Sequence, residues 1–61
     1  MQHLKEIRKR QGLSQEGMAM QIGVSISYYE KVEGGFKNPS FQFLVKLKKS
    51  FGEKVDLNKF F

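Results

Sequence analysis

The chain has 61 residues, 39% of them hydrophobic, with eleven Lys and Arg against six Asp and Glu, and its formal net charge is +5. This length holds one small hydrophobic core, which excludes a large enzyme and predicts a single domain over residues 1–61. Because the chain has no cysteine, one histidine (His3) and only short apolar runs, we expect no disulfide, no metal site, no membrane span and a soluble, cytoplasmic protein.

The first half of the chain predicts two short helices, because apolar residues recur there at helical spacing between glycines. The first predicted helix contains Leu4 and Ile7 and ends at Gly12. The second begins at Ser14, whose hydroxyl can accept a free backbone amide of the first turn, and ends at Gly23. One face of this second helix is expected to be buried, and it consists of Met18, Ala19 and Ile22.

A third helix is predicted between a serine cap, at Ser25 or Ser27, and the glycine pair at residues 34–35. Its Tyr29 and Val32 share one side. The opposite side carries Ile26, Ser27, Glu30 and Lys31. Among these, the apolar Ile26 has no evident packing role on an outward-facing arc.

The second half of the chain predicts a fourth helix, which follows a turn at Asn38–Pro39, is capped by Ser40 and ends at Gly52. Its apolar stripe is wider than one packed face requires and consists of Phe41, Phe43, Leu44, Val45, Leu47 and Phe51. The excess needs a cover, which a short last helix or tail can supply through Val55, Leu57, Phe60 and Phe61. The predicted fold class is therefore all-α, with four to five short helices.

No group of residues has the composition of a catalytic site. There is no cysteine nucleophile, His3 has no evident orienting acid, and the six carboxylates are scattered over helix faces. The glycine pair at residues 34–35 follows a helix and precedes a turn, so a helix cap explains it better than a phosphate-binding loop does. The chain is therefore predicted to be no enzyme and to use no cofactor or small-molecule ligand.

The order of charges and helices favours duplex DNA as the partner. Lys and Arg are concentrated in residues 1–12 and 37–49, on either side of a slightly acidic middle. Within that middle, residues 14–33 form two capped helices joined by a Gly-Val-Ser turn, which is the pattern of a helix-turn-helix unit. Such a unit reads the major groove while basic flanks attract phosphates. On charge alone, two solvated helix faces are the alternative explanation.

Four motifs carry a resemblance to a known family: IRKRQGLSQ at 7–15, MAMQIGVS at 18–25, YYEKVEGG at 28–35 and KNPS at 37–40. They resemble the Cro-type, lambda-repressor-like helix-turn-helix family of bacterial and phage regulators, also called the XRE (xenobiotic-response-element) family, over Leu4 to Phe61. The resemblance implies a lambda-repressor-like bundle of four or five helices. It also implies sequence-specific binding of double-stranded DNA as a homodimer on palindromic operators.

By position, the resemblance implies which side chains read base edges, and these are Ile26, Ser27 and Lys31. Lysine can bond to guanine, serine to several base edges, and isoleucine can pack on a thymine methyl group. Tyr28 and Glu30 match the margin of that surface. The alternative is that these residues are simply solvated on an outer helix face.

The resemblance implies phosphate contacts for Gln15, Lys37 and Asn38. Gln15 can equally support the cap of its helix, and Asn38 can do no more than shape the turn before proline. Arg8 and Glu33 match a pair that in this family forms a structural salt bridge from the first helix to the end of the third.

Other positions bear on affinity and dimerisation rather than on the fold. Four residues depart from the family pattern, namely Gly17, Met20, Phe36 and Lys48. The candidates for a homodimer interface are Phe41, Val45, Phe60 and Phe61. The alternative for these four is that they only pack against one another within one chain.

The leading hypothesis is a DNA-binding transcriptional regulator, a repressor that occupies promoter DNA. The alternative is a protein-interaction module, such as an antitoxin or a phage protein that acts on another regulator. A third possibility is non-specific coating of the nucleoid. A salt titration separates the first two, because phosphate contacts weaken steeply with salt and apolar contacts do not.

Overall fold

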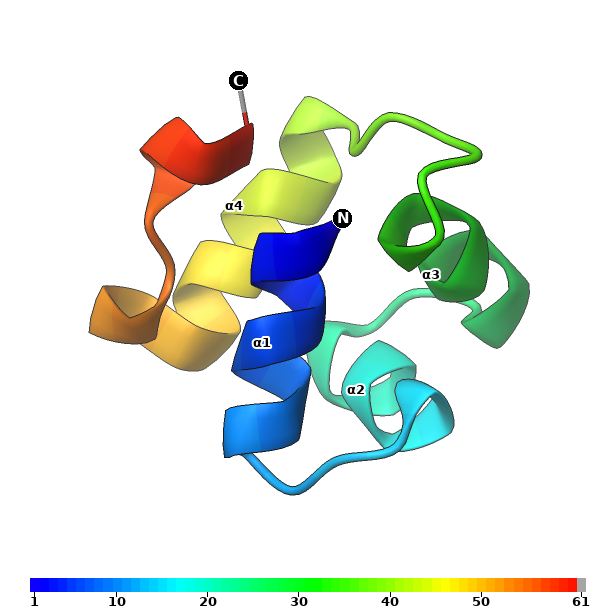
Figure 1. The fold of residues 1–61 in the computed structure, drawn as a ribbon, viewed down its shortest axis with the longest axis horizontal. Coiled ribbons are helices and arrows are strands. Elements are labelled where there is room, and N and C mark those ends of the chain that lie inside the picture. Colours follow the sequence, from blue (N-terminus) through cyan, green and yellow to red (C-terminus); the bar gives the residue numbers. More distant parts are fainter. Residues whose placement is uncertain (61) are drawn as a thin grey trace.

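Residues 1–60, which the computed structural model describes, fold into four α-helices followed by two short 3-10 helices (Figure 1). This all-helical architecture confirms the predicted fold class. In chain order the elements are α1 (Gln2–Arg10), α2 (Gln15–Ile22), α3 (Ile26–Glu33), α4 (Phe41–Phe51), η1 (Gly52–Lys54) and η2 (Leu57–Phe60).

Serine side chains begin three of the four α-helices. The Oγ atom of Ser14 accepts a hydrogen bond from the Gly17 N–H at 3.0 Å, and that of Ser40 accepts one from the Phe43 N–H at 3.0 Å. Ser25, rather than Ser27, caps α3 by accepting from the Tyr28 N–H at 3.1 Å. Each cap satisfies a backbone amide that the first helical turn leaves free, which is why the predicted starts hold.

The turn between α2 and α3 depends on Gly23. Its φ of 88° is left-handed, and its N–H donates to the Ala19 carbonyl at 2.9 Å. A residue with a Cβ atom adopts this φ only at a cost, whereas glycine does so freely. The chain therefore changes direction within the three residues after α2, and α3 begins at Ile26 and packs against α2.

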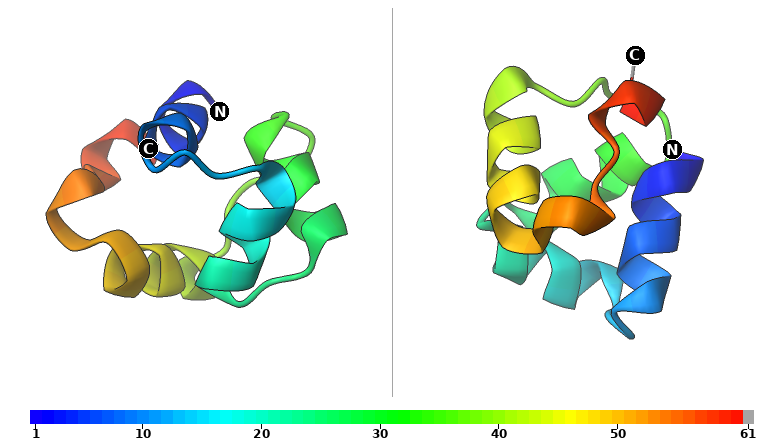
Figure 2. Two further views of the ribbon diagram at one scale, coloured as in Figure 1. Left: turned by 90° about the horizontal axis from the view of Figure 1, so that it is seen from below. Right: turned by 90° about the vertical axis from the view of Figure 1, so that its left-hand side faces the viewer.

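One core lies between the four helices. Its fully buried centre comes from all of them and consists of Leu4, Met18, Ala19, Tyr29, Val32 and Leu47. In α4, the predicted apolar stripe divides: Phe43, Leu44, Leu47 and Phe51 are buried, whereas Phe41 and Val45 stay exposed. α2 packs against both α3 and α4, and α1 packs against α3. This packing leaves α3 at the edge of the bundle (Figures 1 and 2).

The segment after α4 returns to α1 and supplies the expected cover in part (Figure 2). The Asp56 N–H donates to His3 Nε2 at 3.1 Å, and the Phe60 ring meets the His3 ring edge-on with centroids 5.4 Å apart. Val55 and Phe60 are buried, and Leu57 is 37% exposed. Phe61 lies outside the described residues.

Within residues 1–60, none of the helices combines the length and the apolar character needed to cross a bilayer.

Candidate functional site

The outer side of α3 is exposed within the helix-turn-helix unit. Ile26 is 41% exposed, and Ser27, Glu30 and Lys31 are exposed beside it. Among the residues that the structure describes, the side chains of Ser27 and Lys31 form no hydrogen bond or ion pair. The structure thus brings the three predicted base-reading residues onto one open helix face at the edge of the bundle.

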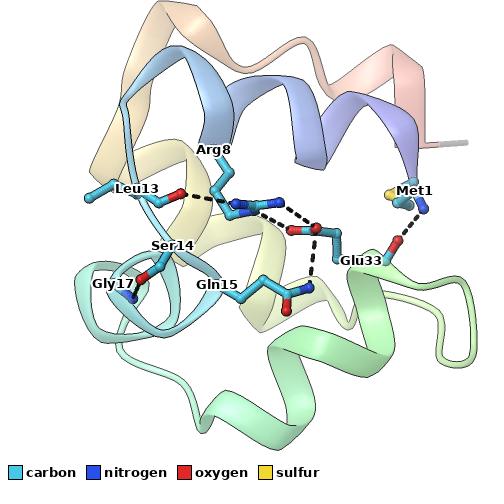
Figure 3. A network of polar contacts seen from close by, with 7 residues as sticks. All are labelled: Met1, Arg8, Leu13, Ser14, Gln15, Gly17 and Glu33. Carbon is cyan, nitrogen blue, oxygen red and sulfur yellow. Dashed lines mark hydrogen bonds and ion pairs between the residues drawn. The ribbon is translucent and has the colours of Figure 1, made fainter.

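An ion pair holds the far end of α3 (Figure 3). Arg8 Nε donates to Glu33 Oε2 at 2.9 Å, and Arg8 Nη2 donates to Glu33 Oε1 at 3.1 Å. The third guanidinium nitrogen, Nη1, donates to the Leu13 carbonyl at 3.0 Å. The Met1 amino group also donates to the backbone carbonyl of Glu33. The expected salt bridge therefore joins α1, the loop after it and the end of α3.

Burial and the guanidinium act against each other at this carboxylate. Burial alone raises the pKa of Glu33, but the hydrogen bonds and charge of Arg8, together with the neighbouring Tyr29 and Gln15, outweigh it, so the pKa lies below its ordinary value of 4.5. The hydrogen bond to Glu33 in turn raises the pKa of Arg8, against the opposing effect of burial. Burial raises the pKa of the neighbouring Tyr29 hydroxyl far above its usual range. At neutral pH the cluster therefore holds a charged pair beside a neutral phenol.

Gln15 belongs to the same network. Its Nε2 donates to Glu33 Oε1 at 3.3 Å (Figure 3), and the residue is half-buried. The family resemblance predicts a phosphate contact for Gln15, and no local pattern indicates this contact, which joins residues 18 positions apart. The side chain thus ties the start of α2 to the end of α3, and the backbone of the first turn of α2 lies beside α3.

Tyr28 fastens the loop between α3 and α4. Its hydroxyl accepts a hydrogen bond from the Ser40 N–H at 3.1 Å, and its ring meets the Phe43 ring edge-on with centroids 5.7 Å apart. Lys37 Nζ lies 5.5 Å above the centre of the same ring. This geometry is a cation–π contact. Tyr28, expected at the margin of the DNA surface, therefore has a packing role that positions Lys37 next to α3.

The loop itself is fixed by the end of α3. The N–H groups of Phe36 and Lys37 both donate to the Lys31 carbonyl, at 2.8 and 3.2 Å. Lys37 and Asn38 are exposed, as is Phe36, whose ring lies against Gly34. Two predicted phosphate-facing residues are thus accessible on a loop whose backbone is held to α3.

The four candidates for a dimer interface do not share one environment. Phe41 is 79% exposed and Val45 is 38% exposed on the outer side of α4. Phe60 is 9% exposed because it packs into its own core against His3. The fourth candidate, Phe61, lies beyond the residues that the structure describes. An open apolar surface is therefore present on α4 and not at Phe60.

Comparisons with known proteins agree with this geometry. A family model described as helix-turn-helix matches residues 4–58. The chain is 44% identical, over 55 residues, to a protein of Bacillus subtilis (strain 168) named "HTH-type transcriptional regulator SlrR". The match covers 88% of this chain and 35% of the relative, so the chain spans about a third of that protein's length. No solved structure gives a significant match.

Proposed function

The chain belongs to the XRE-type, Cro- and lambda-repressor-like helix-turn-helix family, and from this premise we propose that it is a transcriptional repressor that binds operator DNA as a homodimer. In this proposal α3 enters the major groove and occupies promoter DNA without any catalytic step. The observation that carries it is the open outer face of α3, where Ile26, Ser27 and Lys31 lie together.

The chemistry of that face suits base edges. The ammonium group of Lys31 donates hydrogen bonds, which guanine O6 and N7 accept in the major groove. The Ser27 hydroxyl both donates and accepts, and the exposed Ile26 side chain matches a thymine methyl group. Glu30 and Tyr28 flank these three residues on the same helix.

Phosphate contacts come from the two segments held beside α3. The loop presents Lys37 and Asn38, and the contact between Gln15 and Glu33 holds the first turn of α2 nearby. Backbone amides at a helix start attract anions, and lysine neutralises phosphate without reading sequence. These contacts set the orientation of α3 in the groove.

A second copy extends recognition to a palindrome. Two helix-turn-helix units related by a two-fold axis place their recognition helices about 34 Å apart, one turn of DNA. The exposed Phe41 and Val45 on α4 are the contacts proposed for that dimer. Repression then depends on protein concentration and dimerisation.

Selection of bound duplexes from a random pool tests this function. A two-fold consensus is expected, with two half-sites separated by about one helical turn. Binding to the selected site should weaken with salt at a log-log slope of about −0.9 for each phosphate neutralised. Equal binding to the selected and to a scrambled duplex would mean non-specific coating, and no binding to any duplex at low salt would end the proposal.

A further inference from the structure

An apolar groove lies on the side of α4 that faces away from α2. It measures about 580 Å³ and is lined by Phe41, Leu44, Val45, Lys48, Lys49 and Leu57. Phe41, Val45 and Leu57, the last of these on η2, remain more than a third exposed. The groove thus runs between one helix and the returning segment, and its apolar walls carry lysines at one end.

Both charged residues that line this groove are lysines. α4 contains Lys46, Lys48 and Lys49 and no carboxylate. Lys48 Nζ donates to the Val55 carbonyl at 2.9 Å, which holds its ammonium group between α4 and the returning segment. Lys49 is exposed and forms no ion pair with any residue from 1 to 60. The groove therefore presents apolar walls beside two positive charges that no carboxylate of α4 neutralises.

A second copy of the chain pairs only weakly through this groove. A two-fold interface sets the same patch against itself, which brings Lys48 and Lys49 of both copies together. A stable interface also buries about 1,200–2,000 Å², and this groove is small. Like charges thus keep a dimer through Phe41 and Val45 weak, and an occupant that carries carboxylates beside an apolar stripe binds this face better.

We propose that the groove docks an amphipathic helix of a protein partner, with apolar residues seated on Phe41, Val45 and Leu57 and carboxylates facing Lys48 and Lys49. Helices of this kind enter apolar grooves through residues spaced three and four apart. Phe41 and Val45 also belong to the dimer contact proposed above, so a docked helix excludes the dimer. This step rests on the proposed function. A partner bound here releases the operator without contacting α3.

The docking step is tested without DNA. The probe is a synthetic amphipathic peptide of about 15 residues, or four helical turns, with leucines spaced three and four apart and glutamates beside them. The control peptide has lysine at each glutamate position. Fluorescence anisotropy should show saturable binding of the acidic peptide, about tenfold tighter than any binding of the basic one. Amide chemical shifts should move at Phe41, Val45 and Leu57 and not at Ile26 or Lys31.

A matched pair of charge reversals then distinguishes binding in the groove from attraction of the acidic peptide to the overall positive charge of the chain. Lys49→Glu reverses a lining residue and should weaken acidic-peptide binding by about tenfold. Lys46 lies on the same helix, but its Nζ donates to the Gly23 carbonyl at 3.4 Å and does not line the groove. Lys46→Glu should therefore leave acidic-peptide binding nearly unchanged. Both residues are exposed, and unchanged thermal unfolding of each variant confirms that neither effect comes from the fold.

Four results of the peptide experiments would overturn the docking proposal. They are no saturable binding at about 1 mM peptide, equal binding of the two peptides, equal effects of the two reversals, and shifts confined to α3. A free protein whose sedimentation shows a tight dimer at all concentrations would assign the groove to a second copy instead. The competition is tested separately: the acidic peptide should weaken binding to a two-half-site operator and spare an isolated half-site. Unchanged operator binding in the presence of bound peptide would refute the competition and leave docking in place.

Discussion

Arg8 and Glu33, which lie 25 residues apart in the sequence, are joined by two parallel hydrogen bonds of 2.9 and 3.1 Å. A planar guanidinium matches the two oxygens of a carboxylate, so this pair fixes geometry as well as neutralising charge. Arg8 belongs to α1 and Glu33 ends α3. The pair therefore determines how the proposed recognition helix is held relative to the rest of the bundle.

Removal of the arginine should destabilise the fold strongly. Arg8→Ala leaves the Glu33 carboxylate buried without its main partner and is expected to lower the free energy of unfolding by about 3 kcal/mol. Arg8→Lys should give a smaller loss, because it keeps the charge but not the two-bond fork. Urea unfolding measures both. Lys9→Ala, at an exposed neighbouring position, is the control, and an equal loss in that variant would contradict the assignment.

The same pair predicts how stability depends on acid. The pKa of Glu33 is lower in the folded chain than its ordinary value of 4.5, so the folded state favours the ionised carboxylate. Its contribution is complete above about pH 4.5 and is lost as pH falls through the folded pKa. Unfolding of wild type and Glu33→Gln at several pH values should therefore show a stability difference that shrinks below pH 4.5. A difference independent of pH would contradict this.

Two glycines should respond in opposite ways to alanine. Gly17 lies inside α2, and an added Cβ would meet Ser14 Oγ at 3.4 Å, which is ordinary contact. Gly17→Ala is expected to stabilise the protein by about 1 kcal/mol, because alanine favours helix. At Gly34 an added Cβ would lie 3.0 Å from the Phe36 ring and 3.1 Å from the Glu30 carbonyl. Gly34→Ala should therefore lower the urea midpoint, and a gain equal to that of Gly17→Ala would refute this crowding.

Two lysines should separate sequence reading from phosphate attraction. Lys31→Ala is expected to relax preference at one base pair of the selected site by about 1–3 kcal/mol. Lys37→Ala should weaken selected and scrambled duplexes together and reduce the salt slope by about one contact. Its loss also removes the cation over the Tyr28 ring, so circular dichroism must confirm an unchanged fold. Identical effects of the two substitutions would undo this division of roles.

The helix starts and ends were predictable because the forces that set them act over a few residues. The caps at Ser14 and Ser40 each join positions three apart, and Gly23 closes its turn on Ala19. The buried face of α2 follows from helical periodicity in the same way. The salt bridge of Arg8 with Glu33 is long-range, and only the family resemblance pointed to it.

Several side chains have roles that no local pattern indicates. Tyr28 is expected at the margin of the DNA surface, and its hydroxyl also accepts a hydrogen bond from Ser40, 12 positions away. The family resemblance predicts a phosphate contact for Gln15, and the amide of this side chain also donates to Glu33. A polar side chain forms hydrogen bonds with whichever group the fold brings close to it. For Tyr28 and Gln15 that group is distant in the sequence.

The order of residues thus set the class of fold, the helix boundaries and the face of α3 that stays open, since caps and periodicity depend on near neighbours. The packing of α1 and of the returning η1–η2 segment onto the core determined which apolar side chains are buried and which stay exposed. It buried Phe60 and left Phe41 and Val45 exposed beside a lysine-lined groove, while the packing of α3 against α2 joined Gln15 to Glu33. Those outcomes depend on contacts between distant segments, which exist only once the helices have packed.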